Sequence, residues 1–185
     1  MVLKDSVSRE EIDRLASEKG WIFSGEVEAT ENTPYQKIWT TIDRGTAIHY
    51  IEDSLIVIHY LQIKGDRPEE VADDIRASLD VYDKDEIRNM VESVSRSSEV
   101  IDAIYTACVG APQHYDEEFF QLFENVLSHP DPEVRRATIF AMAYAPWPQF
   151  KPLLERVIAT DPEVCKDAEV MLQSLEQNEW KGTGQ

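Results

Sequence analysis

The chain has 185 residues, which is enough for one large domain or two small ones with a substantial apolar core. It carries 36 acidic and 18 basic residues, so its formal net charge is −18. Such a charge disfavours binding to nucleic-acid backbones and anionic membrane surfaces, and it favours encounter with cationic surfaces. The formal net charge is −8 for residues 1–84 and −10 for the remainder, so the acidity is not confined to a tail. Solubility alone is the other interpretation, because net charge bears on solubility and association and not on fold.

The cysteine content and the apolar runs predict a compartment. Only two cysteines occur, Cys108 and Cys165, and both fall within predicted helices, so a disulfide framework is not expected. No segment approaches 18 consecutive apolar residues, and the first five residues lack the apolar run of a signal peptide. We therefore expect a soluble, cytoplasmic protein.

The N-terminal half mixes helix and strand signals. Ser8 and Glu11 have the spacing of a capping box, ahead of apolar residues on one helical face, and Gly20 closes this helix. Residues 21–28 read weakly as a strand, and residues 38–42 form a second strand candidate.

The clearest sheet signal is a β-hairpin. Its strands are predicted at residues 46–51 and 55–63, with the turn at Glu52, Asp53 and Ser54. The second strand is apolar at consecutive positions, which predicts that both of its faces are covered. A helix from Pro68 to Leu79 follows and can cover one face.

The C-terminal half is internally repetitive. Residues 131–135 (Asp-Pro-Glu-Val-Arg) recur 30 residues later as residues 161–165 (Asp-Pro-Glu-Val-Cys). Each motif opens an amphipathic stripe, and an earlier copy of the stripe begins at Val100. A bulkier stripe precedes each of these, in the segments that start near residues 87, 119 and 150. The pattern predicts three stacked helix pairs between about residues 85 and 177.

The motif at residues 131–135 resembles the HEAT repeat, a member of the HEAT and armadillo family of helical solenoids. The resemblance covers the C-terminal half, and the repeats recur at 30 to 34 residues, shorter than is usual for that family. It implies that Arg135 pairs with Asp131 or Asp161, although Cys165 replaces the equivalent arginine in the last copy. The predicted fold is α+β: residues 1–84 form a small antiparallel sheet with flanking helices, and residues 85–185 form a short α-solenoid of HEAT-like helix pairs. After the last helix pair, within the end segment 177–185, residues 181–185 are expected to be a frayed tail.

No catalytic or metal constellation is evident. His49 and His59 lie on the two predicted hairpin strands, each followed by a tyrosine, Tyr50 and Tyr60. A zinc site needs three or four ligands, and these histidines lack a visible third partner, so half-buried sheet histidines are the favoured interpretation. The sequence has no phosphate-binding glycine loop and no nucleophile elbow. We expect neither a cofactor nor a bound metal.

Candidate partner-binding residues are acidic or aromatic. Acidic pairs at helix starts or on polar helix faces present charge to solvent, and an aromatic segment around Pro146 lies at a repeat junction. The candidates are Asp73, Asp74, Glu117, Glu118, Tyr144 and Trp147. For Trp147, exposure as an anchor and burial between helix pairs are both open.

Together these features favour a non-enzymatic interaction protein that binds a protein with a basic surface. A small acidic cytosolic protein suits the masking of a basic partner, for example as the immunity protein of a toxin. The alternative is an enzyme or small-ligand binder with a pocket between sheet and solenoid, around His49 and His59. The sequence does not specify the partner or the oligomeric state.

Overall fold

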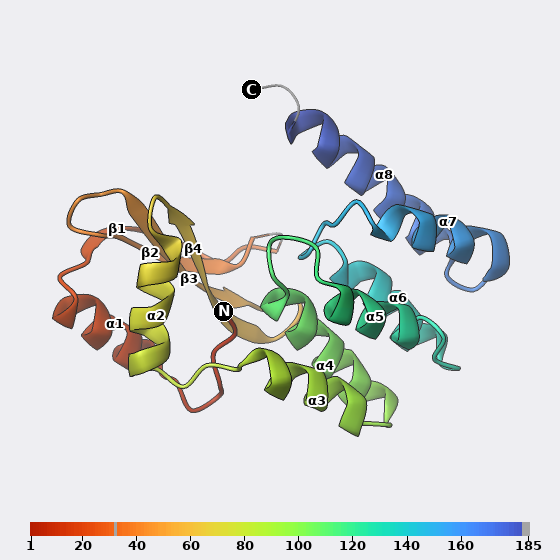
Figure 1. Cartoon of the computed structure of the whole chain (residues 1–185), viewed down its shortest axis with the longest axis horizontal. Helices are drawn as coiled ribbons and strands as arrows, with labels where there is room; N and C mark the ends of the chain where they lie inside the picture. Colours follow the sequence, from red (N-terminus) through yellow and green to blue (C-terminus); the bar gives the residue numbers. More distant parts are fainter. Residues whose placement is uncertain (32, 183–185) are drawn as a thin grey trace. The chain divides into compact units, whose positions relative to one another are not determined.

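The computed structural model describes residues 1–31 and 33–182, with side chains as far as Gln177 (Figure 1). The chain is an α+β protein that divides into two compact units, Met1–Asp83 and Lys84–Gln185. In chain order the elements of the first unit are α1 (Arg9–Glu18), β1 (Ile22–Val27), β2 (Tyr35–Thr40), β3 (Thr46–Asp53), β4 (Ile58–Gly65) and α2 (Pro68–Ser78). Those of the second are α3 (Lys84–Ser93), α4 (Ser97–Gly110), α5 (Glu117–Val126), α6 (Pro132–Ala141), α7 (Phe150–Thr160) and α8 (Cys165–Gly182).

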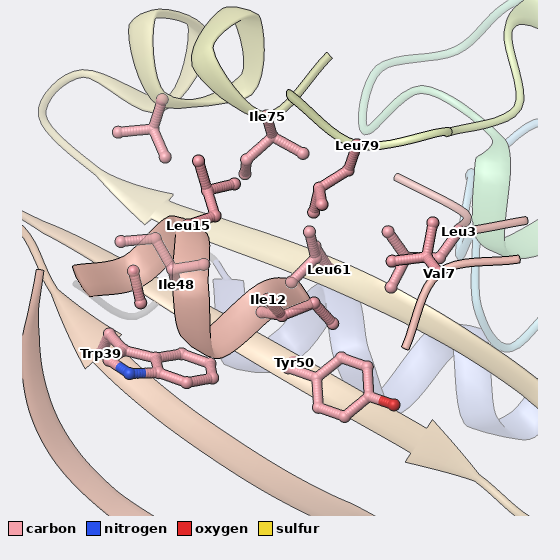
Figure 2. Packing of buried hydrophobic residues seen from close by; sticks show 12 residues of the cluster. Leu3, Val7, Ile12, Leu15, Trp39, Ile48, Tyr50, Leu61, Ile75 and Leu79 are labelled. Atoms are coloured by element: carbon pink, nitrogen blue, oxygen red, sulfur yellow. The ribbon is translucent and has the colours of Figure 1, made fainter. Parts of the chain in front are cut away.

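The first unit is built on a four-stranded antiparallel sheet in the order β1-β2-β3-β4. The pairing of Trp39 with Ile48 and of Tyr50 with Leu61 places these four buried side chains on one face. Helices α1 and α2 cover that face. Figure 2 shows apolar side chains of both helices, among them Leu15 and Ile75, pointing toward the strand residues.

Helix α1 begins at the predicted capping box. The Ser8 hydroxyl accepts from the Glu11 backbone N–H, and the Glu11 carboxylate accepts from the Ser8 N–H at 2.8 Å. The predicted apolar face is buried at Ile12, Leu15 and Ala16. This helix is therefore confirmed, because both its start signal and its periodicity are local properties of the sequence.

The predicted hairpin is confirmed, but its turn was placed wrongly. Strand β3 extends to Asp53, and β4 begins at Ile58 and not at Leu55. The Asp53 carboxylate accepts from the Leu55 N–H at 3.0 Å, and Val57 adopts a left-handed φ of 56°. A β-branched residue rarely takes that conformation, so sequence rules favour strand there.

The prediction that both faces of the second hairpin strand are covered was wrong. In β4 only Leu61 is buried, and Leu55 and Val57 are exposed in the turn. The second predicted strand was also displaced, because β2 ends at Thr40. Thr41 starts a turn in which its carbonyl accepts from the Arg44 N–H at 2.8 Å, and Ile42 is exposed there.

An N-terminal segment completes this unit. Leu3 donates its N–H to the His59 carbonyl at 3.1 Å, and Leu61 donates to the Met1 carbonyl at 2.9 Å. The same segment bonds on its other side to residues 80–82, where Tyr82 donates to the Val2 carbonyl at 3.0 Å. Residues 1–3 therefore lie along the outer edge of β4.

The second unit contains six helices between Lys84 and Gly182 and no strand among its described residues. Each first helix contacts the helix that follows it: α3 with α4, α5 with α6, and α7 with α8. Helix α4 also contacts α6, and α6 contacts α8. The predicted stripe of α6 is buried, with Val134, Ala141 and Met142 fully inaccessible. Small residues such as Ala141 allow close approach of the helices at these positions.

Arg135 links two of the repeated segments. Its guanidinium donates to the Asp161 carboxylate at 2.6 Å, to Glu163 at 2.8 Å, and to the carbonyls of His129 and Pro130 at 2.8 and 2.9 Å. Of the two partners that the HEAT resemblance implied, the hydrogen bonds thus select Asp161.

The C-terminus is more helical than expected. Helix α8 continues to Gly182, so the prediction of a frayed tail was wrong for residues 181 and 182, and residues 183–185 lie outside the described part of the chain. Helix α8 also starts later than α6 does within the repeated motif. Pro132 opens α6, whereas the equivalent Pro162 lies in a turn and the helix begins at Cys165.

Candidate interaction surface

The outer face of α6 carries an apolar residue where the helical pattern calls for a polar one. Glu133, Arg136 and Phe140 follow one another at helical spacing on this face, and the neighbours Ile139 and Ala141 are buried. The Phe140 side chain is 41% exposed. The ring is therefore partly accessible on a helix face that is otherwise polar at Glu133 and Arg136.

Phe140 is the centre of an aromatic group. Its ring meets that of Tyr105 from α4 edge-on at 6.1 Å between centroids, and that of Tyr144, just after α6, at the same distance. Both tyrosines are half-buried. Edge-to-face contacts of this kind hold the rings in place. We call Tyr105, Phe140 and Tyr144 the aromatic surface.

Charged groups border the aromatic surface. Burial is the main cause that raises the pKa of Tyr105 above its usual value, and the Asp102 carboxylate on the same helix adds to the effect. Arg136 lies one turn before Phe140, and its guanidinium contacts the carboxylates of Glu133 and, at 3.1 Å, Asp167. Two acids share this single cation, so the group formed by Arg136, Glu133 and Asp167 carries a net negative charge.

The repeat places a second exposed apolar residue at the equivalent position of α8. Val170 lies 30 residues after Phe140, the same offset as between the two Asp-Pro-Glu-Val motifs, and it is 67% exposed. Sequence analysis missed Phe140, Tyr105 and Val170. Phe140 and Val170 could have been identified from the sequence, because both are apolar residues that lie outside the buried apolar stripe of their helices.

Trp147 is not an exposed anchor. Its side chain is 3% exposed, and its indole N–H donates to the Pro112 carbonyl at 3.2 Å. Its ring stacks on Phe150 at 5.4 Å and meets Phe123 edge-on. Trp147 therefore fills the space between the segments before α5 and α7, and its assignment as a partner-binding residue is corrected. Tyr144, by contrast, stays at the surface as a member of the aromatic surface.

Tyr115 is a further partly exposed aromatic residue that the sequence did not single out. It is 39% exposed and lies against Trp147 and Phe120 at 5.7 Å. Its hydroxyl donates to the Glu117 carboxylate, and this hydrogen bond raises the pKa of Tyr115 to about 12. Tyr115 thus remains a neutral hydrogen-bond donor at physiological pH.

The four acidic candidates are divided between the two units. Asp73 pairs with Arg76 at 2.7 Å, and Asp74 pairs with Lys19 at 2.5 Å, both within the first unit. In the second unit Glu118 lies 3.0 Å from the amino group of Lys84. Glu117 accepts from Gln121 at 3.1 Å, besides its bond from Tyr115. Asp73, Asp74 and Glu118 are thus each paired with a cation of their own unit, whereas the hydrogen-bond donors to Glu117 are uncharged.

The histidine pocket suggested by the sequence does not form. His49 pairs with Gln62 and His59 pairs with Glu52, so the two histidines lie on opposite faces of the sheet. His59 meets Tyr50 edge-on at 6.2 Å on the helix-covered face, whereas Tyr60 lies on the face of His49. The sequence could not reveal this separation without the register, which the displaced turn had obscured.

His49 is instead part of a side-chain pair within the sheet. Its Nδ1 lies 3.2 Å from the Gln36 side-chain oxygen, and burial lowers its pKa, with Lys64 adding to the effect. No group of three or more histidine, cysteine or acidic side chains that could hold a metal occurs in the described part of the chain.

An open groove of about 370 Å³ lies beside the start of α2 in the first unit. Two ion pairs border it, Lys19 with Asp74 and Arg67 with Asp43, and Trp21 is among its lining residues. Glu70 also lines the groove and shares Arg67 with Asp43, so the three carboxylates outnumber the two cations.

Comparison with protein-family models, with curated proteins and with solved structures finds no match to this chain. Among the described residues, no helix combines the length and apolar character that crossing a bilayer requires.

Proposed function

We propose that the chain is a non-enzymatic protein–protein interaction module whose aromatic surface binds a partner with a basic face. The single observation that carries the proposal is the exposure of Phe140 on a polar helix face, flanked by Tyr105 and Tyr144. Aromatic residues with ordered rings are the usual energetic anchors of protein interfaces. The net charge of −18 supports a basic partner.

Within this proposal the second unit is a short HEAT-like solenoid. The 30-residue offset between the Asp131 and Asp161 motifs supports it, as does the contact of Arg135 with Asp161 across that offset. The contacts of α4 with α6 and of α6 with α8 are those expected of second helices in successive repeats. Phe140 and Val170 then occupy one repeated position of the binding face.

The biological role that fits these properties is an acidic inhibitor, of the kind that acts as an immunity protein by masking a basic toxin in the cytoplasm. Negative charge on both units accelerates encounter with such a partner, and the aromatic surface slows its release. We do not propose a ligand pocket around His49 and His59, because the two side chains lie on opposite faces of the sheet.

Affinity capture from the native cell, followed by kinetics on the captured partner, tests the proposal. We expect the association rate to fall steeply between about 50 mM and 500 mM salt, because exposed charges are screened over about 8 Å at physiological ionic strength. Dissociation should change little with salt. An association rate independent of salt would leave the acidity as a solubility device.

Two variants distinguish specific binding by the aromatic surface from non-specific hydrophobic binding. Phe140→Ala should raise the dissociation rate at least about tenfold, because interface anchors cost about 2 kcal/mol or more when truncated. Leu55→Ala is the matched control, since it removes a more exposed apolar side chain, 61% exposed, from the first unit. Equal effects of the two variants would refute the assignment of the aromatic surface.

A further inference from the structure

The two edges of the sheet are treated differently. Residues 1–3 lie along the outer edge of β4, through the hydrogen bonds of Met1 with Leu61 and of Leu3 with His59. Strand β1 is the opposite edge and pairs only with β2 among the described residues. Alternate backbone N–H and C=O groups of an antiparallel edge strand point away from the sheet and are available to another strand.

The exposed edge is also apolar. Phe23 is 56% exposed, and Ile22 and Val27 are 38% and 37% exposed. Phe23 pairs with Trp39, which is buried at 4% on the helix-covered face. Phe23 therefore continues the core layer one strand beyond the part that α1 and α2 cover. A strand added at β1 would bury this side chain as well as satisfy the backbone.

A bulge limits where regular pairing can occur. The register shifts between Phe23 and Gly25, so Ser24 is an extra residue and the regular edge comprises Gly25 to Val27. No atom lies within 4 Å of the position that a Cβ on Gly25 would occupy, so the edge is not obstructed at this residue. The regular edge is too short for backbone pairing to suffice, so the contact with Phe23 must supply much of the affinity.

Charge decides which strand fits. Glu26 is exposed near the end of β1 and lies 3.7 Å from the Lys37 amino group, and Glu28 and Glu31 are exposed in the segment that follows. A second copy of the chain would bring the same acids together, and each copy carries a net charge of −18, so self-pairing is disfavoured. A strand with basic side chains meets these carboxylates favourably.

We infer that the β1 edge is a docking site for an extended, basic segment of a partner protein, which adds to the sheet as a fifth strand beside Ile22–Val27. The inference rests on the proposed function in taking the partner to be basic. It assigns part of the binding to the first unit, apart from the aromatic surface.

The probe is a blocked synthetic peptide of alternating lysine and valine, with a matched peptide in which glutamate replaces lysine. Amide hydrogen exchange by NMR reports the edge directly. The outward-facing amides of Ile22–Val27 should be protected about tenfold by the lysine peptide and left unchanged by the glutamate peptide. Failure of the lysine peptide to protect these amides would overturn the inference.

Phe23→Lys should weaken binding of the lysine peptide about tenfold, because it removes the apolar area that the strand would cover. Leu55→Lys is the control: it makes the same charge change at a side chain of similar exposure, 61%, away from the edge. Its effect should stay below about twofold. Equal losses in the two variants would show that bulk charge governs binding and would overturn the inference.

Two further outcomes separate this inference from the proposed function. Phe140→Ala should leave peptide binding unchanged, and a loss comparable to that of Phe23→Lys would place the peptide on the second unit. Sedimentation of the protein alone tests whether a second copy of the chain, and not a partner strand, occupies the β1 edge. A dimer that Phe23→Lys converts to monomer would replace the basic partner strand with a second copy.

Discussion

Replacing Arg135 by alanine should destabilise the helical unit strongly. The Arg135 side chain is 10% exposed, and its guanidinium holds the Asp161 carboxylate, which is 21% exposed. The same group donates to the carbonyls of His129 and Pro130. The variant leaves one largely buried carboxylate and two carbonyls without this donor, and it also loses the packing of the arginine stem.

The size of the loss follows from these exposures. Breaking a fully buried ion pair by removing one partner costs about 3–5 kcal/mol. Glu163, the other acidic partner, is 62% exposed, so water screens that contact and it adds little. We therefore expect Arg135→Ala to lower the free energy of unfolding by about 2–3 kcal/mol.

A urea titration followed by circular dichroism at the helix band measures this loss. With a slope of about 1–3 kcal/mol per molar urea, the midpoint should fall by roughly 1 M. Arg136→Ala is the matched control, because it removes the neighbouring arginine, whose side chain is 40% exposed, and it should shift the midpoint far less. Equal shifts in the two variants would refute the bridging role of Arg135.

The same pair predicts a pH signature. The hydrogen bond from Arg135 is the main cause of the lowered pKa of Asp161. The stabilisation that Asp161 provides is therefore present above its unfolded pKa of about 3.9 and is lost as the pH falls through the lower folded value. In Arg135→Ala this part of the acid dependence should disappear. If the free energy of unfolding of Arg135→Ala fell with acid pH as it does in the unaltered protein, another donor would set the pKa of Asp161.

Three further predictions concern stability. Ala141→Glu should cost more than about 3 kcal/mol in denaturant titration, because Ala141 is fully buried on α6 and the new charge would have no partner; a loss under about 1 kcal/mol would contradict that placement. Val57→Asn should raise the free energy of unfolding by about 1 kcal/mol, since asparagine tolerates the φ of 56° and the valine is 85% exposed; unchanged thermal stability would show that the turn is not strained. Hydrogen bonds from the Thr41 hydroxyl and the Gly45 N–H lower the pKa of Asp43 to about 2. The stabilisation of the folded state by Asp43 should therefore be complete above about pH 4 and vanish as the pH falls through 2. In an acid titration of stability, Asp43→Asn should remove that pH dependence.

The features that sequence reasoning predicted well are local ones. The capping box at Ser8 and the apolar stripe of α6 depend on residues three or four positions apart, and both are present in the structure. The hairpin turn was misplaced because Val57 takes a backbone conformation that propensity rules assign to glycine or asparagine. Because the turn was predicted at the wrong residues, the predicted register of the two strands was also wrong. The placement of His49 and His59 on opposite faces could therefore not be predicted.

The candidate site depends on contacts that no single segment encodes. Whether Trp147 is exposed could not be decided from the sequence, because its burial depends on Pro112 and on Phe123, which lie more than 20 positions earlier. Phe140 was identifiable in principle as an apolar residue off the buried stripe. Its significance appears only when Tyr105, from a neighbouring helix, is found against it.

The N-terminal segment also shapes how the first unit folds. Residues 1–3 complete the sheet edge through a contact between Met1 and Leu61, 60 positions apart, and reach still further to Tyr82. Such pairings form late because the entropy of closing a long loop must be overcome first, whereas neighbouring strands joined by short turns pair early. The edge of β4 therefore stays open until these long-range contacts form, and the first unit is most prone to wrong strand pairing in that interval.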